Sequence, residues 1–135
     1  MTEAEVLAAA RRWAEVWQTA WRTHDPELVR PLYADDAVFR SQPFRDPQDP
    51  ATYAAWAFQD EAEARVWFAE PRVAGGDRAA VEYWGVSIPQ HGAVETIAGV
   101  ALIRFAPDGR VVEQRDYWNS ADGTVEPYEG WGSEA

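Results

Sequence analysis

The spacing of apolar residues changes once along this chain, from helical periodicity in the first part to strand periodicity from Arg65 onward. The second part is divided by three turn signals, at Gly75–Asp77, Gln90–Gly92 and Pro107–Gly109. These signals predict four long strands joined as a meander, over about residues 65–74, 78–89, 93–106 and 110–119. Helices followed by a run of strands are typical of an α+β domain, in which the helices cover one face of an antiparallel sheet.

Three helix start signals precede the strands. Thr2 and Glu5 have the spacing of a capping box, and Asp25 and Asp49 each precede a proline. They predict helices from Thr2, over 26–33 and over 50–61, the second of them short, bent or partly of the tighter 3-10 kind because of Pro31. The first helix has one apolar face, which is formed by Val6, Ala10, Trp13, Trp17, Ala20, Trp21 and His24.

A short strand over 37–41 and a loop over 42–49 are predicted between the second and third helices, with Asp35 and Asp36 ending the second helix. The chain of 135 residues shows no break in composition, so we expect one domain over residues 1–135. Its core is expected to extend to residue 119, and residues 120–135 are expected to form an acidic, mostly irregular tail.

Charge and composition narrow the choice of partners. The formal net charge of −11 repels phosphate backbones and anionic lipid surfaces, so nucleic acid and membrane are not expected as partners. The longest apolar run, Ile97–Ile103, is too short for a membrane span. The chain has no cysteine, and no basic segment with an apolar run precedes the first helix. We therefore expect a cytoplasmic protein without a signal peptide.

The strand over 93–106 is apolar on both faces. One alternating set comprises Ile97, Gly99, Ala101, Ile103 and Phe105, and the other comprises Val94, Ala98, Val100 and Leu102. Helices on one face leave the other face to be covered by something else. We predict a homodimer through the sheet, with a helix or the tail as the alternative cover.

The last strand is predicted to turn a carboxylate inward. Val112, Gln114, Asp116 and Trp118 alternate with Val111, Glu113, Arg115 and Tyr117. The first set carries one charge and the second carries two, so the first set is expected to face the interior. Partial desolvation would raise the pKa of Asp116 toward the range useful for proton transfer. The alternative is that Asp116 pairs with Arg104 or another strand neighbour at the sheet rim.

Eight tryptophans exceed what a core of this size needs for packing, so some are expected to line a cavity or a subunit contact, although all eight in the core is an equal alternative. Tyr83 is a candidate hydrogen-bond donor to a developing oxyanion, but the face of its strand is undecided because both alternating sets are mixed. The expected substrate-binding residues are Trp17, Trp21, Phe39, Ser41, Tyr53, Trp56, Tyr83, Gln114 and Trp118.

No metal or nucleotide cofactor is expected. His24 lies at a helix end and His91 in a turn, and neither has a second imidazole or carboxylate at ligand spacing. No glycine-rich loop precedes a helix, because Gly75 and Gly76 join two strands.

Two segments carry a resemblance to a known family. Tyr33-Ala-Asp-Asp-Ala-Val-Phe-Arg-Ser41 follows a capped helix, and Asp108-Gly-Arg-Val-Val-Glu-Gln-Arg-Asp-Tyr-Trp-Asn119 forms the last strand. With the order of elements, they resemble the nuclear transport factor 2-like superfamily and, within it, the SnoaL-like branch. The resemblance covers the chain to about Asn119. It implies three N-terminal helices on a strongly curved antiparallel or mixed sheet, which forms a cone around an internal pocket.

The segment Arg115–Asn119 is similar to the final strand of the limonene epoxide hydrolase family, in which the aspartate activates a water molecule. The similarity implies a general base role for Asp116. That family also has an Arg-x-Asp pair on a neighbouring strand, where Glu82–Val86 contains neither residue. Phe39 and Ser41 stand where it has a tyrosine and an asparagine.

Together these features predict a cofactor-independent enzyme of the proton-transfer class, an isomerase, cyclase, dehydratase or hydrolase. Its substrate would be an apolar ring-containing molecule, and Asp116 would be the general acid or base. The alternative is a non-catalytic domain that binds a ligand in the same pocket. A third reading, a dimeric scaffold, predicts a pocket filled by tryptophan side chains.

Overall fold

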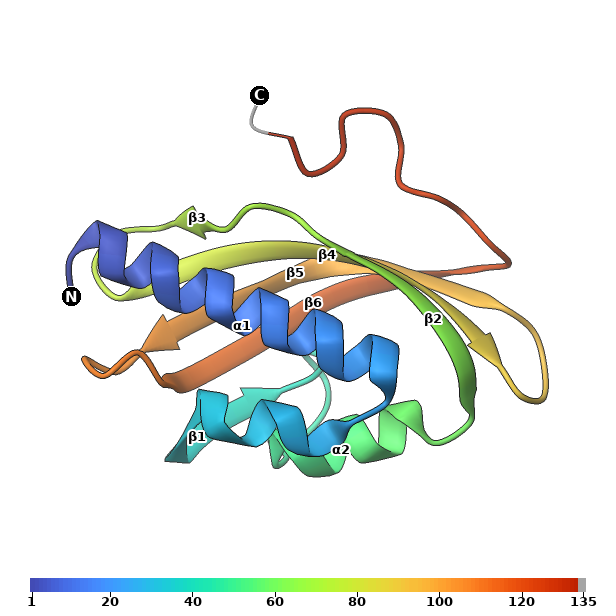
Figure 1. Ribbon diagram of the computed structural model, residues 1–135, viewed down its shortest axis with the longest axis horizontal. Coiled ribbons are helices and arrows are strands. Elements are labelled where there is room, and N and C mark those ends of the chain that lie inside the picture. Colours follow the sequence, from blue (N-terminus) through green and yellow to red (C-terminus); the bar gives the residue numbers. More distant parts are fainter. Residues whose placement is uncertain (134–135) are drawn as a thin grey trace.

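The structure, a computed structural model, describes residues 1–133 as helices packed on one sheet (Figure 1). The elements are α1 (Glu3–Thr23), the 3-10 helix η1 (Pro26–Leu32), β1 (Tyr33–Arg40), α2 (Pro50–Phe58), β2 (Glu61–Phe68), β3 (Arg72–Val73), β4 (Arg78–Pro89), β5 (Glu95–Phe105) and β6 (Val111–Asp122). The predicted α+β class, with three helical segments on a curved mixed sheet, is confirmed.

Local signals set where the helices begin. The Thr2 hydroxyl accepts a hydrogen bond from the Glu5 amide at 3.1 Å, and the Glu5 carboxylate accepts one from the Thr2 amide at 2.8 Å. Asp49 accepts a hydrogen bond from the Thr52 amide at 2.9 Å at the start of α2. Asp25 makes no side-chain cap bond, and the segment that follows it forms a 3-10 helix that includes Pro31.

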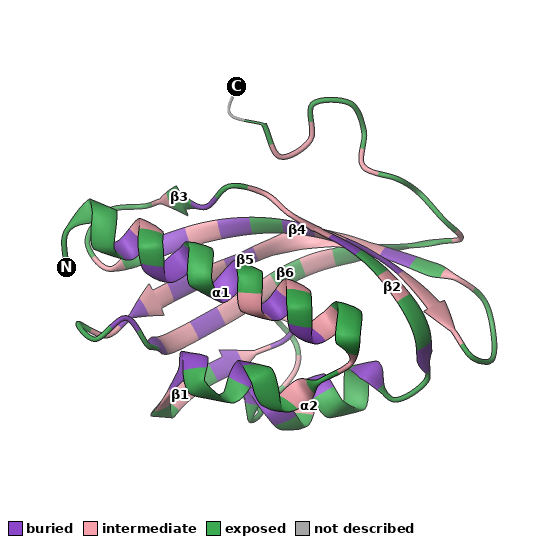
Figure 2. Ribbon diagram, in the orientation of Figure 1, coloured by how far each residue is buried: buried purple, intermediate pink, exposed green. Residues whose placement is uncertain are grey.

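Five of the strands lie in the order β1-β6-β5-β4-β2, and β3 pairs with the first residues of β4, on the same edge of β4 as β2. β1 runs parallel to β6, and the remaining pairs are antiparallel. α1 crosses one face of the sheet, and buried and exposed positions alternate along it (Figure 2). The core between α1 and the sheet includes Val6, Ala10, Trp13, Val81, Ala101, Ile103 and Phe105.

Several predicted boundaries were wrong because strand pairing overrides the local signal. β1 begins at Tyr33 instead of 37, since Tyr33 pairs with Val111 of β6, and Asp35 and Asp36 lie inside the strand. The third helix ends at Phe58 instead of 61. The residues that follow it pair with β4, from Glu61 opposite Pro89 onward.

The other differences concern the remaining strands. The strand predicted over 65–74 is two strands, β2 and β3, separated by a segment that contains Pro71. β6 extends to Asp122, which pairs with Glu95. A register shift between β5 and β6 places Val111 in the core, where the alternation predicted Val112.

β5 and β6 approach each other too closely at Gly99 for any other residue. A Cβ atom at Gly99 would lie 2.2 Å from the carbonyl oxygen of Tyr117 and 2.5 Å from the Cβ of Trp118. The first of these contacts is with backbone, which a rotamer change cannot relieve. Gly99 therefore permits the local path of the sheet next to Asp116.

The variant Gly99→Ala is expected to lose about 3 kcal/mol of unfolding free energy, because the added methyl forces the two strands apart. Urea unfolding followed by circular dichroism measures the loss. Gly92→Ala is the control, because a Cβ added at Gly92 would meet no atom within 4 Å. Any loss of stability in this control comes from the backbone, since alanine is strained at the φ of +99° that Gly92 adopts. A variant of Gly99 as stable as the wild type would contradict the close approach.

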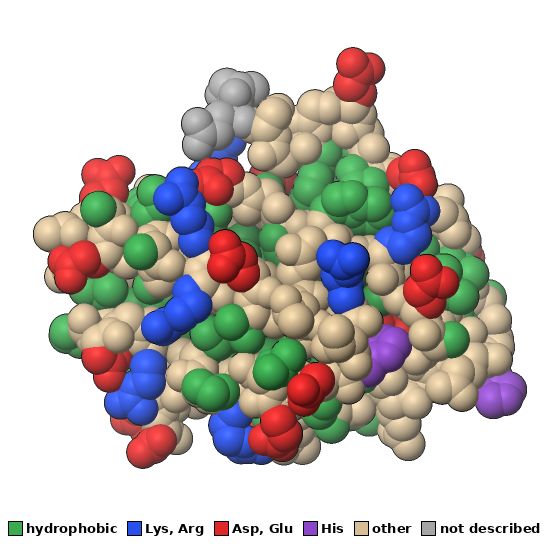
Figure 3. All heavy atoms as spheres, in the orientation of Figure 1, with side chains coloured by type: hydrophobic (Ala, Val, Ile, Leu, Met, Phe, Trp, Pro, Cys, Tyr) green, Lys and Arg blue, Asp and Glu red, His purple; other side chains and the backbone are tan. Residues whose placement is uncertain are grey.

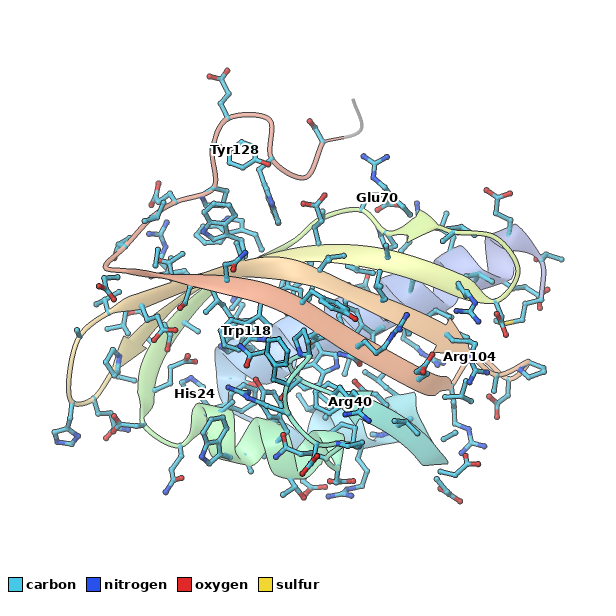
Figure 4. All side chains as sticks on the ribbon, turned by 180° about the vertical axis from the view of Figure 1, so that it is seen from behind. His24, Arg40, Glu70, Arg104, Trp118 and Tyr128 are labelled. Carbon is cyan, nitrogen blue, oxygen red and sulfur yellow. The ribbon has the colours of Figure 1, made fainter. Side chains whose placement is uncertain are left out.

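The C-terminal segment 123–133, the outer strap, covers part of the sheet face opposite α1 (Figure 4). The Trp84 indole donates a hydrogen bond to the Val125 carbonyl at 2.8 Å, and the rings of Tyr128 and Trp131 meet the Trp84 ring edge-on. Beneath it Val86 is fully buried. The tail, which was the alternative cover for this face, therefore covers the β4 side of it.

The strap leaves another part of the outer face open. Ala98, Val100 and Leu102 of β5 are only half-buried, and Tyr117 of β6 is 42% exposed.

Acidic and basic side chains are interspersed on the opposite, helical side of the molecule (Figure 3). Within residues 1–133, no helix has the length and apolar character needed to cross a bilayer.

Candidate functional site

A cavity of about 770 Å³ lies between the inner face of the sheet and the helices α1 and α2. Its size is in the range of pockets that hold drug-sized organic molecules. Nearly half of the lining residues are aromatic, and every predicted site residue except Ser41 contributes to the wall. These residues are Trp17, Trp21, Phe39, Tyr53, Trp56, Tyr83, Gln114, Asp116 and Trp118.

Ser41 lies behind the wall instead of in it. It is fully buried, its hydroxyl accepts a hydrogen bond from Arg45 at 3.1 Å, and its carbonyl accepts one from the Trp118 indole at 2.7 Å. Because its polar groups are used within the protein, Ser41 supports cavity residues instead of lining the cavity. Ser41 is therefore the one predicted substrate-binding residue that does not line the cavity.

Asp116 extends from the middle of β6 into the cavity. Its alternation with Gln114 and Trp118 places all three side chains on the inner face. Burial raises the pKa of Asp116 to about 7, although the hydrogen bonds from Gln114 and Tyr83 act in the opposite direction and lower the pKa. Arg104, the alternative partner, instead lies 3.9 Å from Glu113. Asp116 is therefore a carboxyl group that changes charge near neutral pH.

The orientation of the Gln114 amide is fixed by donors behind it. The Trp13 indole donates to Gln114 Oε1 at 3.0 Å, and the Tyr33 hydroxyl also donates to this oxygen. An indole N–H can only donate, so the acceptor must be the amide oxygen and the Gln114 Nε2 group must point the other way. There it donates to Asp116 Oδ1 at 2.9 Å. One carboxyl oxygen of Asp116 is thus held in place by a fixed donor.

Two phenols lie near Asp116. Burial raises the pKa of both Tyr53 and Tyr83, and the negative charge of Asp116 raises each further. Both hydroxyl groups therefore stay protonated at neutral pH and can donate hydrogen bonds into the cavity. The structure also decides the orientation of β4: Tyr83 faces inward, while Glu82 is exposed and Trp84 lies under the outer strap.

A second polar cluster lies in the cavity wall around Glu61, which is buried. Its carboxylate accepts hydrogen bonds from the Trp21 indole at 3.2 Å, from the Ser87 hydroxyl at 2.5 Å and from His24 Nε2 at 2.8 Å. Gly85 leaves room for this arrangement, because a Cβ there would lie 2.5 Å from the Trp21 ring. His24, which has no carboxylate at metal-ligand spacing in the sequence, therefore pairs with one from a distant strand.

Sequence reasoning missed Glu61 and Arg45 as cavity residues. Glu61 was assigned to a helix end, and no local pattern connects it to His24. Arg45 lies in the loop between β1 and α2, and its guanidinium lies 5.6 Å from the Trp56 ring centre and 5.5 Å from that of Trp118. The one sequence feature that marks Arg45 is that it is the single basic residue in a loop with two prolines and two aspartates.

The arrangement can move protons inside a cavity whose wall is rich in aromatic side chains. Asp116 can accept or return a proton near neutral pH, and the two tyrosines can donate hydrogen bonds to an oxygen atom nearby. Within residues 1–133, no three histidine, cysteine, aspartate or glutamate side chains group as metal ligands would.

The model of the SnoaL-like domain family matches residues 10–114, which include α1 from Ala10 onward and the sheet up to the first residues of β6. The chain belongs to the SnoaL-like family. The resemblance found in the sequence is thereby confirmed. No curated protein sequence matches the chain.

Solved structures with the same fold have low sequence identity to this SnoaL-like domain. A protein provisionally named an aromatic ring hydroxylase, from Novosphingobium aromaticivorans, is 18% identical with a TM-score of 0.70, over 90% of this chain and 96% of that one. A nuclear transport factor 2-like protein of unknown function from Exiguobacterium sp. 255-15 is 15% identical with a TM-score of 0.66, over 82% and 98%. A computationally designed 17-OHP binder is 21% identical with a TM-score of 0.64, over 85% and 98%. At these identities the likeness establishes the fold alone.

Proposed function

We propose that this SnoaL-like domain is a cofactor-independent enzyme of the proton-transfer class, with Asp116 as its general acid or base. The reaction is an isomerisation, cyclisation, dehydration or hydrolysis of an apolar ring-containing molecule. The observation that carries the proposal is the position of Asp116, a carboxyl group with a pKa of about 7 inside a cavity of about 770 Å³. A general base works best when its pKa lies near the working pH.

The proposed first step is the removal of a proton from a carbon atom next to a carbonyl group. The C–H bond breaks, its proton goes to Oδ2 of Asp116, and its electron pair forms an enolate. Tyr53, which its raised pKa keeps protonated, donates a hydrogen bond to the enolate oxygen, while Tyr83 donates its hydrogen bond to Asp116. Asp116 then returns the proton to the same carbon or to another one, so the carboxylate is regenerated.

The Gln114 hydrogen bond supports this role in a second way. It holds Oδ1 of Asp116 in place, and the second carboxyl oxygen, Oδ2, is the one proposed to take the proton. The aromatic rings of Trp17, Phe39 and Trp118 offer flat apolar surfaces on which a ring system can pack. This lining supports an apolar ring-containing substrate.

A non-catalytic domain that binds the same kind of molecule is the alternative. It is favoured by one comparison, the designed 17-OHP binder, because its fold is the same as that of this chain. A scaffold with a filled pocket is not supported, since the cavity is open space between the sheet and the helices.

The test uses 2-tetralone, an aromatic bicyclic ketone with acidic α-hydrogens, in deuterated buffer. The wild-type protein is expected to speed deuterium incorporation beyond the buffer rate, as measured by NMR. Quenching of tryptophan fluorescence by the same ketone reports binding, since five tryptophans line the cavity: Trp13, Trp17, Trp21, Trp56 and Trp118. Quenching without exchange favours the binding domain. The absence of both quenching and exchange would contradict a small-molecule pocket of this class.

A homodimer through the open part of the outer sheet face is a further proposal. The half-buried apolar side chains of β5 and the exposed ring of Tyr117 support it, and the second copy would lie beside the outer strap. Sedimentation equilibrium tests it, and a monomer mass at micromolar concentration would contradict it. The cytoplasmic location stays a prediction from the sequence, to be tested by fractionation of the cells that produce the protein.

A further inference from the structure

Arg45 is the one cationic side chain among the described residues that line the cavity. The whole chain carries 12 basic and 23 acidic residues, so cations are in the minority. Within residues 1–133, the ion pairs with nitrogen–oxygen distances up to 4.0 Å do not include Arg45. A positive charge without a carboxylate partner therefore lies in the wall of an otherwise acidic and aromatic cavity.

Arg45 is held in position by contacts on several sides. Its guanidinium lies between the rings of Trp56 and Trp118, at 5.6 and 5.5 Å from their centres. One of its N–H groups donates to the Ser41 hydroxyl at 3.1 Å, and its backbone carbonyl accepts a hydrogen bond from Arg40 at 3.0 Å. A guanidinium has five N–H donors, so others are available to a ligand. The charge is thus presented in a fixed direction.

The position of Arg45 relative to the acidic residues gives the cavity an electrical polarity. Trp56, which stacks on Arg45, is 61% exposed, so this pair lies at the entrance. Asp116, which is half-buried, and Glu61, which is buried, are held by hydrogen bonds in the wall, and the exposed Asp60 and Glu95 also line the cavity. An anionic group is therefore attracted to Arg45 and repelled by the carboxylates elsewhere in the wall.

We propose that Arg45 makes the cavity selective for ring compounds that carry a carboxylate. The carboxylate pairs with the guanidinium at the entrance, and the ring system extends between the aromatic walls toward Asp116. Arginine suits this role because its planar group can form two parallel hydrogen bonds with a carboxylate. This inference rests on the proposed small-molecule site and adds its substrate class and the direction in which the substrate enters.

The test compares anthracene-9-carboxylate with anthracene-9-carboxamide, which has the same ring and nearly the same shape but no charge. Dissociation constants are measured by tryptophan quenching and calorimetry at pH 7.5 and 0.15 M salt. The wild type is expected to bind the carboxylate about tenfold more tightly than the amide, despite its net negative charge. Arg45→Gln is expected to reduce this preference to about twofold or less, mainly through weaker carboxylate binding.

Two further variants control the experiment. Arg110→Gln removes the same charge from an exposed turn, where Arg110 pairs with Asp108, and is expected to keep the wild-type preference. Arg45→Lys keeps the charge without the planar fork and is expected to give an intermediate preference. Thermal unfolding shows that each variant is folded.

Equal affinity of the wild type for the two probes would overturn the inference. A preference that survives in Arg45→Gln would also overturn it, because another group would then recognise the carboxylate. In both cases binding itself would still support the cavity as a small-molecule site. If the wild type binds neither probe nor 2-tetralone, the proposed function fails, and this inference fails with it.

Discussion

Asp116→Asn is expected to slow deuterium exchange into 2-tetralone by about 10²–10⁴-fold, the usual contribution of a positioned general base. The asparagine oxygen can still accept the hydrogen bond that Gln114 donates, so the shape of the wall is kept. An amide, however, has no basic site near neutral pH. Quenching of tryptophan fluorescence by the ketone should therefore remain, while exchange falls to the buffer rate.

The pH dependence of the wild-type rate provides a second readout. As a base, Asp116 must be ionised, and burial raises its pKa to about 7. The exchange rate above that of the buffer should thus rise with pH and level off above about 7. A rate that is independent of pH between 5 and 8 would contradict this role for Asp116.

Glu113→Gln is the matched control for this experiment. Glu113 lies on the same strand but on the set that faces away from the cavity, near Arg104. Removing its charge should leave the exchange rate within about twofold of the wild type, since surface changes of this kind have small effects. Equal losses in Asp116→Asn and Glu113→Gln would mean that the carboxylate at 116 has no special part in the chemistry.

The same Asp116→Asn variant is expected to be more stable than the wild type at pH 8, by up to about 4 kcal/mol. Burial raises the pKa of Asp116 from an ordinary value of 3.8 to about 7, so the folded protein holds a proton that the unfolded chain releases. Between these values the folded state binds more protons, and stability falls as the pH rises. Below pH 3.8 the contribution of the neutral group is fully present, and above about 7 it is lost.

Urea unfolding at several pH values measures this effect as a difference between the two proteins. The difference should be close to zero near pH 4, grow up to about pH 7 and stay constant above it. Subtracting the variant from the wild type removes the contributions of the other carboxylates, whose titration is common to both. A variant that is less stable at pH 8, or a difference that does not change with pH, would show that Asp116 is not buried in its charged form.

A gain in stability paired with a loss of activity would itself indicate function. A carboxylate in a largely apolar cavity destabilises the fold at neutral pH, and an uncharged side chain of the same shape does not. Such sites are commonly found where activity depends on a strained or desolvated group.

Much of the fold follows from local sequence signals. The capping pairs of α1 and α2 set where these helices begin, and the apolar face of α1 places Trp13 and Trp17 against the sheet. The parallel pairing of β1 with β6 was not predictable in this way, because it joins Tyr33 to Val111 and keeps two aspartates within a strand. The limits of β2 and β3 also depend on pairing with β4.

The candidate site also combines features that the sequence predicts with features that it does not. The sequence by itself determined that Asp116, Gln114 and Trp118 project from one face of the last strand, because successive side chains of a strand point to opposite sides. Only the tertiary structure decided the direction of the Gln114 amide, the pairing of His24 with Glu61 and the place of Arg45 between two tryptophans. These contacts join residues far apart in the chain, and their geometry depends on how helices, loop and sheet pack together, which no local periodicity encodes.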